Sequence, residues 1–264
     1  MRLMKKSNLP QFTIITPSYN QAAFIRETIE SVLSQQYPNL NYWVIDGKST
    51  DGTVKILAEY KKYLQSISEK DAGQTAALNK GVLLSKPKPG FFAYLNSDDF
   101  YLPFALKKVA QTFADHPEKM WLVGDCKIVD THSKEIQNNI RLYKKLWRSV
   151  LSFFVLTVLN PLPQPAIFIR TEALEKVGLF NQNLHYVMDY EYWLRLYKEF
   201  GAPLVLDTEL AAFRIHGESK GTTSYKKQFA EGYQIASKFT KNWLALLLHR
   251  LHNQVIFLTY SQIK

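Results

Sequence analysis

The chain has 264 residues, and 46% of them are hydrophobic, which is enough for a folded core and excludes wholesale disorder. Its 33 basic and 23 acidic residues give a formal net charge of +10, which favours an anionic partner: a nucleotide, a nucleic acid or an acidic membrane surface. A single cysteine, Cys126, excludes an internal disulfide and a CxxC zinc site, and it predicts a cytoplasmic protein. The chain reaches Pro10 before any long apolar segment, so we expect no cleavable signal peptide.

Strands and helices are expected to alternate over the first hundred residues. Short apolar or β-branched runs predict buried strands at 12–16, 42–45, 64–68 and 91–95. Apolar residues at helical spacing predict helices at 22–35, around 54–60 and at 74–85. This alternation predicts a doubly wound, mostly parallel α/β sheet flanked by helices.

The second half of the chain is less regular. We expect strands at 121–130, 166–169, 204–206 and 211–214, and helices at 171–177 and 190–200. The stretch 134–148 is polar and basic, whereas 150–159 is strongly apolar but shorter than a membrane span. The pattern is helical beyond about residue 224. We therefore predict one domain over 1–223 and a C-terminal helical extension over 224–264.

The most informative segment is 91–103, FFAYLNSDDFYLP, in which an apolar strand ends at two adjacent carboxylates, Asp98 and Asp99. In an open α/β sheet, ligands bind beyond the carboxyl ends of the strands. Mg²⁺ is usually held by one or two carboxylates, with substrate phosphates completing its coordination. The pair therefore predicts a divalent-metal site, although Asn, Ser and Asp also favour an ordinary turn.

Four segments occur in an order that carries a family resemblance: TPSYNQAAFIRETIESVLSQ, VIDGKSTDGT, YLNSDDFYLP and VMDYEYWLRL. Together they resemble the family 2 inverting glycosyltransferases, which have the GT-A fold, over about 13–224. The resemblance implies a hexosyltransferase-type enzyme that uses Mn²⁺ or Mg²⁺. It would transfer a sugar from a nucleotide-sugar donor, first of all a UDP-sugar, to a hydroxyl of a glycan, polysaccharide or lipid-linked acceptor. No GxGxxG follows the first strand and no GxxxxGK[ST] occurs, which weighs against a dehydrogenase or a P-loop protein.

The resemblance places a nucleotide pocket at the end of the first strand. Thr16, Pro17, Tyr19 and Asn20 match residues that line the base and ribose of the donor. The alternative for Asn20 is a helix cap, a use that needs no ligand. Tyr19 could equally belong to the core.

Two further acids are expected on the donor side. Asp46 matches an acid that accepts hydrogen bonds from the base or ribose. Many relatives carry a second acid at the next position, where this chain has Gly47, so base selectivity stays open. Asp71, in SEKDAGQ, matches a donor-side loop, and a solvated acid beside Lys70 is an equally good interpretation.

The acidic pair matches the metal-binding motif of the family in an SDD form, with Asp99 as the direct ligand and Asp98 supporting the ribose or metal waters. His216, in the segment FRIHGESK, is a second candidate metal ligand or diphosphate contact, although a lone His is often structural. Arg214 would add positive charge beside the diphosphate. Gln164 matches a residue near the acceptor or the donor sugar.

Asp189 aligns with the catalytic base of the family, which removes the proton of the acceptor hydroxyl. It lies at the start of a predicted helix, where it could also be an N-cap. Glu191 is the local competitor, but residues two positions apart on a helix do not share a face. We therefore favour Asp189. Trp193 either faces the acceptor or belongs to the core.

Three other classes of protein compete with the transferase interpretation. The net charge, with 15 Tyr and 16 Phe, suggests nucleic-acid binding, but no RRM or KH pattern occurs, so we expect no nucleic acid partner. A sugar nucleotidyltransferase would need a glycine-rich basic loop after the first strand, and TPSYNQ is not one. An inactive relative with a scaffold role is disfavoured because the acidic positions are retained.

Cationic and apolar residues occur together outside the predicted catalytic part. The segment 150–159 and the lysine-rich C-terminal helices predict peripheral contact with the inner face of a membrane. The alternative is that both segments pack on the domain or form a dimer contact.

Overall fold

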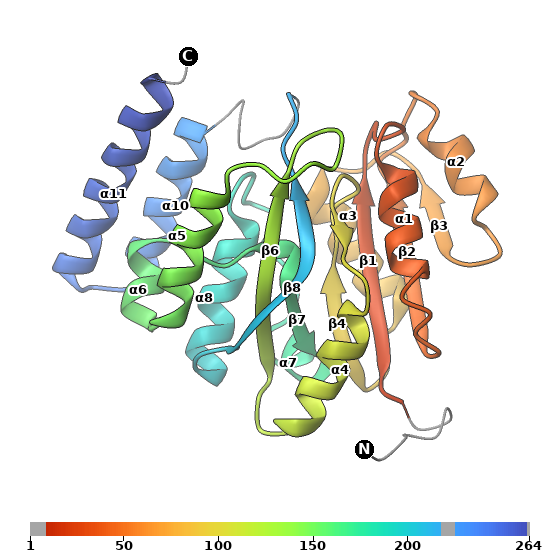
Figure 1. Cartoon of the computed structure of the whole chain (residues 1–264), viewed down its shortest axis with the longest axis horizontal. Helices are drawn as coiled ribbons and strands as arrows, with labels where there is room; N and C mark the ends of the chain where they lie inside the picture. The colour runs from red at the N-terminus through yellow and green to blue at the C-terminus, as the bar shows by residue number, and fades with distance from the viewer. Residues whose placement is uncertain (1–8, 218–224, 263–264) are drawn as a thin grey trace.

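The structure of the chain is a computed structural model that describes residues 9–217 and 225–262, with the backbone alone at 225 and 258–262. A central sheet separates two layers of helices, and a further group of helices lies beyond one end of the sheet (Figure 1). The predicted domain boundary between residues 223 and 224 lies outside the described residues.

The sheet has eight strands in the order β3-β2-β1-β4-β7-β6-β8-β5. Their bounds are Gln11–Ser18 (β1), Leu40–Asp46 (β2), Gln65–Ser68 (β3), Gly90–Tyr94 (β4), Phe100–Tyr101 (β5), Trp121–Val129 (β6), Ile167–Arg170 (β7) and Leu204–Arg214 (β8). Strands β1 to β4 are mutually parallel, as the alternation of strands and helices predicts. The other half is mixed, because β7 runs antiparallel to β4 and β6, and β5 runs antiparallel to β8.

The helices are Ile25–Leu33 (α1), Thr53–Glu59 (α2), Gln74–Ser85 (α3), Ala105–Asp115 (α4), Asn138–Ser149 (α5), Phe153–Val158 (α6), Thr171–Val177 (α7), Met188–Phe200 (α8), Tyr225–Phe239 (α10) and Trp243–Gln262 (α11). The predicted C-terminal helix is two helices, because Asn242 interrupts it and caps α11. The Asn242 side-chain oxygen accepts the N–H groups of Leu244 and Ala245, at 3.0 and 3.2 Å. The polar stretch 134–148 is mostly helix α5, and the two late strands predicted at 204–206 and 211–214 are one strand, β8.

Both faces of the sheet are covered, so neighbouring strand residues belong to different core clusters. In β1, Ile14 packs with α1 and α4, whereas Ile15 packs with α3, α7 and α8. In β4, Phe91 and Phe92 alternate in the same way. Burial on both faces explains why these strands are continuous apolar runs in the sequence.

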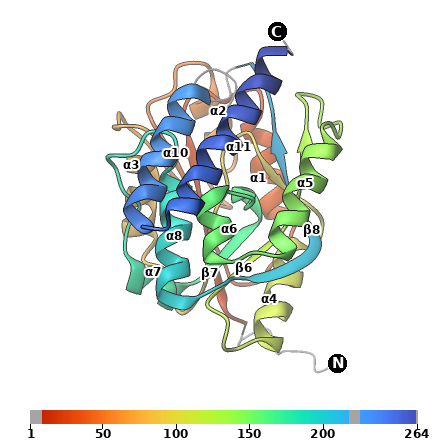
Figure 2. The same cartoon turned by 90° about the vertical axis from the view of Figure 1, so that its left-hand side faces the viewer.

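The C-terminal helices are part of this packing. Ile235 and Ala236 of α10 are buried in the same cluster as Trp193 of α8. Figure 2 shows α5, α6, α8, α10 and α11 gathered at one end of the molecule. In the described parts of the chain, no helix has both the length and the apolar character that crossing a bilayer requires.

Candidate active site

The parallel strands β1, β2 and β4 end at one edge of the sheet, and the loops that follow them meet there. The loop after β1 begins at Tyr19, the loop after β2 begins at Gly47, and the acidic loop follows β4. The first helical turns of α3 and α8 touch each other beside these loops. The Thr75 hydroxyl of α3 lies 2.8 Å from the Met188 sulfur of α8. The topology therefore gathers most of the predicted site residues.

Asp46 organises the loop after β2. It is fully buried, and its carboxylate accepts the N–H and hydroxyl of Ser49, at 2.9 and 2.5 Å, and the hydroxyl of Ser68, at 2.6 Å. The Ser49 hydroxyl oxygen in turn accepts the N–H of Asn20, at 2.7 Å. Asp46 thus links β2, β3 and the loop after β1, and its direct contact with a nucleobase stays a prediction.

Asn20 holds the same two loops together. Its backbone is in the left-handed region, at φ 51°, which Asn tolerates better than most residues. Its side-chain oxygen accepts the N–H of Thr50, at 2.9 Å. Asn20 therefore links the loops after β1 and β2 in this structure, and its contact with a ligand stays a prediction.

Tyr19, Gly47 and Asp71 line the open side of this region. Tyr19 is 63% exposed, so it does not belong to the core. A Cβ atom added to Gly47 would lie 3.1 Å from an Asp71 carboxylate oxygen and 3.3 Å from the Tyr19 ring. Asp71 also accepts the N–H of Gly73, at 2.8 Å, which fixes its orientation.

Thr16 and Pro17 lie in the core at the end of β1. Both are buried, and the Thr16 hydroxyl is hydrogen-bonded to the Tyr42 hydroxyl at 3.2 Å. Their predicted contact with the donor stays a prediction. The neighbouring Ser18 hydroxyl is buried and has no hydrogen-bond partner among the described residues, which makes it an unpredicted polar group at the end of β1.

The two adjacent carboxylates have different environments. Asp99 is fully buried, and its Oδ1 accepts the backbone N–H of Arg214 at 2.9 Å. Burial, and then the neighbouring charge of Asp98, raise the pKa of Asp99 well above its usual value, against the lowering effect of that hydrogen bond. The Asp98 side chain is 20% exposed, and its Oδ2 lies 3.0 Å from His216 Nε2. In this structure Asp98 therefore faces His216, whereas Asp99 fixes the loop, and which of the two would bind a cation directly stays a prediction.

Arg214 fixes the acidic loop from behind. Its guanidinium donates to the backbone oxygens of Asp98 and Asp130, each at 2.9 Å, and pairs with Glu27 at 2.5 Å. The side chain is fully buried between the rings of Phe24 and Phe100. In this structure Arg214 therefore positions the acidic loop, and its contact with the diphosphate stays a prediction.

Three amide side chains form a network beside the acidic loop. Gln74 donates to the side-chain oxygen of Asn96 at 2.7 Å, and Asn96 donates to the side-chain oxygen of Gln164 at 3.1 Å. Gln164 also donates to the Tyr94 carbonyl at 2.7 Å. The network brings the predicted residue Gln164 to the acidic loop and adds Gln74 and Asn96, whose roles depend on contacts distant in the sequence.

Asp189 of α8 is close enough to Tyr94 of β4 to act on it. Burial raises the pKa of the Tyr94 hydroxyl well above its usual value, and the negative charges of Asp189 and Asp99 add to this effect. Both carboxylates therefore act on one side chain of β4. Lys144 of α5 also approaches: burial lowers the pKa of its ammonium, and the charge of Asp189 partly offsets the shift.

The competing acid Glu191 is already engaged. It pairs with Arg195 one turn later on α8, at 2.9 Å, and Arg195 donates to the carbonyls of Val177 and Leu179. This structural ion pair favours Asp189 over Glu191 as the base. Trp193 is 1% exposed and belongs to the core, so it does not face an acceptor.

Glu231 of α10 holds the turn that precedes Asp189. Its carboxylate accepts the N–H groups of His185, Tyr186 and Val187, at 3.1, 2.8 and 3.0 Å. No side chain of the turn itself caps the start of α8. An acid from the C-terminal helices, 42 positions beyond Asp189, thereby positions the candidate base.

The donor set suits a divalent cation only in part. Within residues 9–217 and 225–257, no cluster of three or more His, Cys, Asp or Glu could hold a metal ion. The Asp98 and His216 pair supplies one carboxylate oxygen and one imidazole nitrogen, ligands used by Mn²⁺ and related ions. Two protein ligands fit a cation whose remaining positions are filled by substrate phosphates and water.

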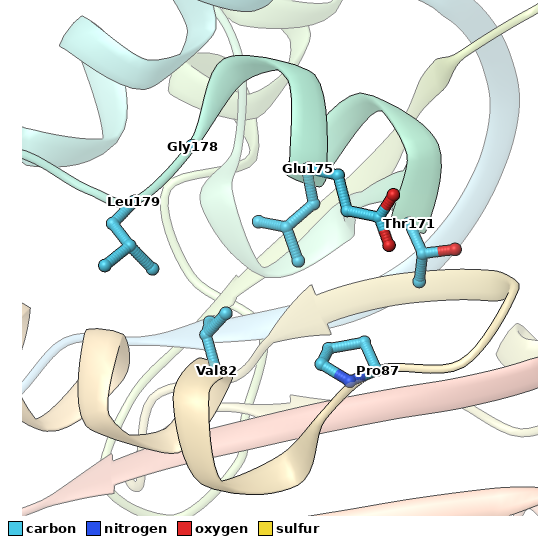
Figure 3. Close-up of a pocket in the computed structure, with 7 residues that line it drawn as sticks. Val82, Pro87, Thr171, Glu175, Gly178 and Leu179 are labelled. Carbon is cyan, nitrogen blue, oxygen red and sulfur yellow. The ribbon is translucent and has the colours of Figure 1, made fainter.

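A separate hollow lies away from these residues, between α3 and α7 (Figure 3). It has a volume of about 220 Å³, and Val82, Pro87, Glu175 and Leu179 are among its lining residues. None of the site residues described above lines it. We therefore place the candidate active site at the loops after β1, β2 and β4.

The chain belongs to glycosyl transferase family 2, because the sequence model described as "Glycosyl transferase family 2" matches residues 13–178. The "Uncharacterized glycosyltransferase RP339" of Rickettsia prowazekii is 27% identical over 236 residues, which are 88% of this chain and 72% of that protein. The "Putative teichuronic acid biosynthesis glycosyltransferase TuaG" of Bacillus subtilis is 37% identical over 103 residues, 38% of this chain and 40% of that protein. The protein is a glycosyltransferase, as the motifs predict.

Solved structures show the same fold. Residues 1–349 of TarS from S. aureus, in complex with UDP-GlcNAc, match with a TM-score of 0.63 at 19% identity, over 86% of this chain and 66% of that chain. The mannosyltransferase PcManGT from Pyrobaculum calidifontis, in complex with GDP-Man and Mn²⁺, matches with a TM-score of 0.70 at 17% identity, over 97% and 74%. The predicted GT-A fold is confirmed.

Proposed function

We propose that the chain transfers a sugar, with inversion at the anomeric carbon, from a nucleoside diphosphate sugar to a hydroxyl of a glycan, polysaccharide or lipid-linked acceptor. The observation that carries this proposal is the approach of two sets of groups to one region. The charges of Asp189 and Asp99, from distant parts of the chain, both raise the pKa of the Tyr94 hydroxyl. Asp98, the neighbour of Asp99, lies 3.0 Å from His216. The cytoplasmic location expected from the sequence is part of the proposal.

Asp98 and His216 would hold a divalent cation, Mn²⁺ or Mg²⁺, against the donor diphosphate. Such a cation stabilises the negative charge that develops on the departing diphosphate, a contribution of several kcal/mol to the barrier. The buried Asp99 and Arg214 keep the acidic loop in place, so that Asp98 does not have to be ordered on binding.

Asp189 acts as the general base. As the acceptor oxygen forms its bond to the anomeric carbon, the bond from that carbon to the diphosphate oxygen breaks on the opposite face. The acceptor proton passes to the Asp189 carboxylate, and the bonding electrons leave with the diphosphate. Glu231 supports this step by fixing the turn at 185–187.

A uridine nucleotide is our first choice of donor, because one structural neighbour is a complex with UDP-GlcNAc. Another neighbour is a complex with GDP-Man and Mn²⁺, so guanosine is the main competitor. We propose a glycan or polysaccharide acceptor because the TuaG relative is named for teichuronic acid biosynthesis.

The proposal is tested by donor turnover. The purified chain is incubated with UDP-, GDP- and dTDP-sugars, with and without Mn²⁺, and release of the nucleoside diphosphate is followed with water as the acceptor. Thermal unfolding with UDP, GDP, dTDP and CMP measures binding in parallel. We expect metal-dependent stabilisation by one nucleoside diphosphate and slow release from its sugar conjugate. Absence of stabilisation by all four nucleotides, with and without metal, would contradict the proposal.

A further inference from the structure

Two helices at one end of the molecule carry exposed apolar stripes. In each stripe the residues recur every fourth position, so they lie on one side of the helix. The members are between 43% and 72% exposed: Leu142, Leu146 and Val150 along α5 and at its end, and Trp243, Leu247 and Leu251 on α11. Exposed apolar side chains gathered in this way indicate an interaction surface.

A contact between α5 and α11 holds the two helices together. The ring of Tyr143 stacks on the ring of His252 with a centroid distance of 6.2 Å, and the Tyr143 hydroxyl lies 3.0 Å from His252 Nε2. Tyr143 is adjacent to Leu142, and His252 is adjacent to Leu251. Both helices face the viewer in Figure 2. We call this surface, made of the six residues of the two stripes, the α5–α11 face.

Positive charge gathers on the α10 and α11 side of the α5–α11 face. No Asp or Glu occurs in residues 136–171 or 232–264 of the sequence. Five exposed cations of α10, α11 and the connection between them form no ion pair with any described residue: Lys226, Lys227, Lys238, Lys241 and Arg250. The cations of α5 differ, because Arg141 and Arg148 pair with Asp125, and Lys145 pairs with Asp207.

We propose that the α5–α11 face lies on the surface of an anionic lipid bilayer. Apolar side chains would enter the boundary of the acyl chains, while the lysines of α10, Lys241 and Arg250 contact acidic head groups. Trp243 is the residue type that favours this interface, and it follows Lys241 by two positions. A second copy docked on the same face would bring these cations against each other, which disfavours a symmetric dimer. This inference goes beyond glycosyl transfer and does not depend on it.

Co-sedimentation of the full chain with lipid vesicles tests the proposal. Vesicles of phosphatidylcholine alone are compared with vesicles that also contain phosphatidylglycerol, at low and at high salt. We expect binding to the anionic vesicles at low salt, weaker binding at high salt, and a blue shift of tryptophan emission on binding. Each cation near the surface should account for about a fivefold change in partitioning.

Paired variants separate the two contributions. Lys238→Gln with Lys241→Gln should weaken binding to anionic vesicles by more than tenfold, roughly the product of two such cations. Trp243→Ser with Leu247→Ser should remove the emission shift and most of the binding. Two matched controls remove exposed residues of the same kinds elsewhere. Lys61→Gln with Lys62→Gln changes the loop after α2, and Leu83→Ser with Leu84→Ser changes α3. Both controls should bind as the parent does.

Three results would overturn the proposal. The first is no co-sedimentation with anionic vesicles at low salt. The second is an equal loss of binding in the Lys61 and Lys62 control, which would indicate attraction by net charge alone. The third is a parent dimer in solution that Trp243→Ser with Leu247→Ser converts to a monomer without changing lipid binding, which would assign the face to a second copy. Circular dichroism spectra and melting temperatures establish that each variant is folded.

Discussion

Glu231→Gln is expected to slow catalysis without weakening donor binding. In the parent, one carboxylate oxygen accepts the N–H groups of Tyr186 and Val187, and the other accepts the N–H of His185. The oxygen of a glutamine amide can still accept the N–H groups of Tyr186 and Val187. Its NH₂ group cannot accept the N–H of His185, so that hydrogen bond is lost. A hydrogen bond to a charged group contributes about 1.5–3 kcal/mol. Because this site is partly exposed, we expect a loss near the lower end of that range.

The loss should affect the turn before Asp189 most strongly. A displacement of about 1 Å in a catalytic group can cost roughly 100-fold in rate. We therefore expect kcat for release of UDP from a UDP-sugar, with water as the acceptor, to fall about 10- to 100-fold. The donor KM should stay within about twofold of the parent value, because Glu231 lies behind the base and not beside the acidic loop.

Two controls distinguish positioning from general loss of stability. Glu199→Gln removes an exposed acid from the far end of α8 and should leave kcat unchanged. Val109→Ala truncates a buried residue of α4 and should lower the melting temperature by at least as much as Glu231→Gln. If Val109→Ala slows release as much as Glu231→Gln does, or if Glu231→Gln keeps the parental kcat, the reasoning about the turn is refuted.

Three further predictions concern the base, the donor pocket and the C-terminal helices. Asp189→Asn should lower the rate of sugar transfer by roughly two to four decades and leave UDP binding nearly intact. Glu191→Gln should keep most of the activity. A parental rate for Asp189→Asn would place the base elsewhere. Gly47→Asp puts a second carboxylate against Asp71. In a titration with UDP, this variant should lose several-fold more affinity for UDP than Gly47→Ala does. Equal affinities of the two variants would contradict this prediction. Burial lowers the pKa of His249 below its usual 6.5. As the pH falls, this side chain therefore takes up a proton at a higher pH in the unfolded chain than in the folded chain. The free energy of unfolding should then decrease as the pH drops below about 6.5. The fall in melting temperature should be smaller in His249→Gln, and identical pH profiles would exclude His249 as its source.

Much of the fold was predictable because local signals mark the ends of elements. The predicted bounds 74–85 and 171–177 are those of α3 and α7, since Gly73 precedes the first helix and Gly178 ends the second. Helix α4 was not predicted, although Leu106, Val109 and Phe113 have helical spacing. Strand β5 has two residues and exists through its pairing with β8, so the sequence near it carries no signal.

The site was predictable in composition and less so in roles. Asp98 and Asp99 are adjacent and of the same type, so the sequence does not distinguish them. In the structure Asp99 is the buried one, and it accepts the backbone N–H of Arg214, which is 115 positions away. Arg214 suggested a phosphate contact, but distant parts of the chain supply its partners. Glu231 has no motif around it, because its role depends on how α10 packs beside α8.

The central claim is that Asp98 and His216, and not the buried Asp99, provide the side chains that bind a cation for the nucleoside diphosphate. The most direct measurement is the affinity for UDP by calorimetry, with and without Mn²⁺, in the parent and in Asp98→Asn, His216→Ala and Asp99→Asn. We predict that Mn²⁺ strengthens UDP binding in the parent and in Asp99→Asn, and that the increment is lost in the other two variants. A full Mn²⁺ increment in Asp98→Asn, with its loss in Asp99→Asn, would contradict the account.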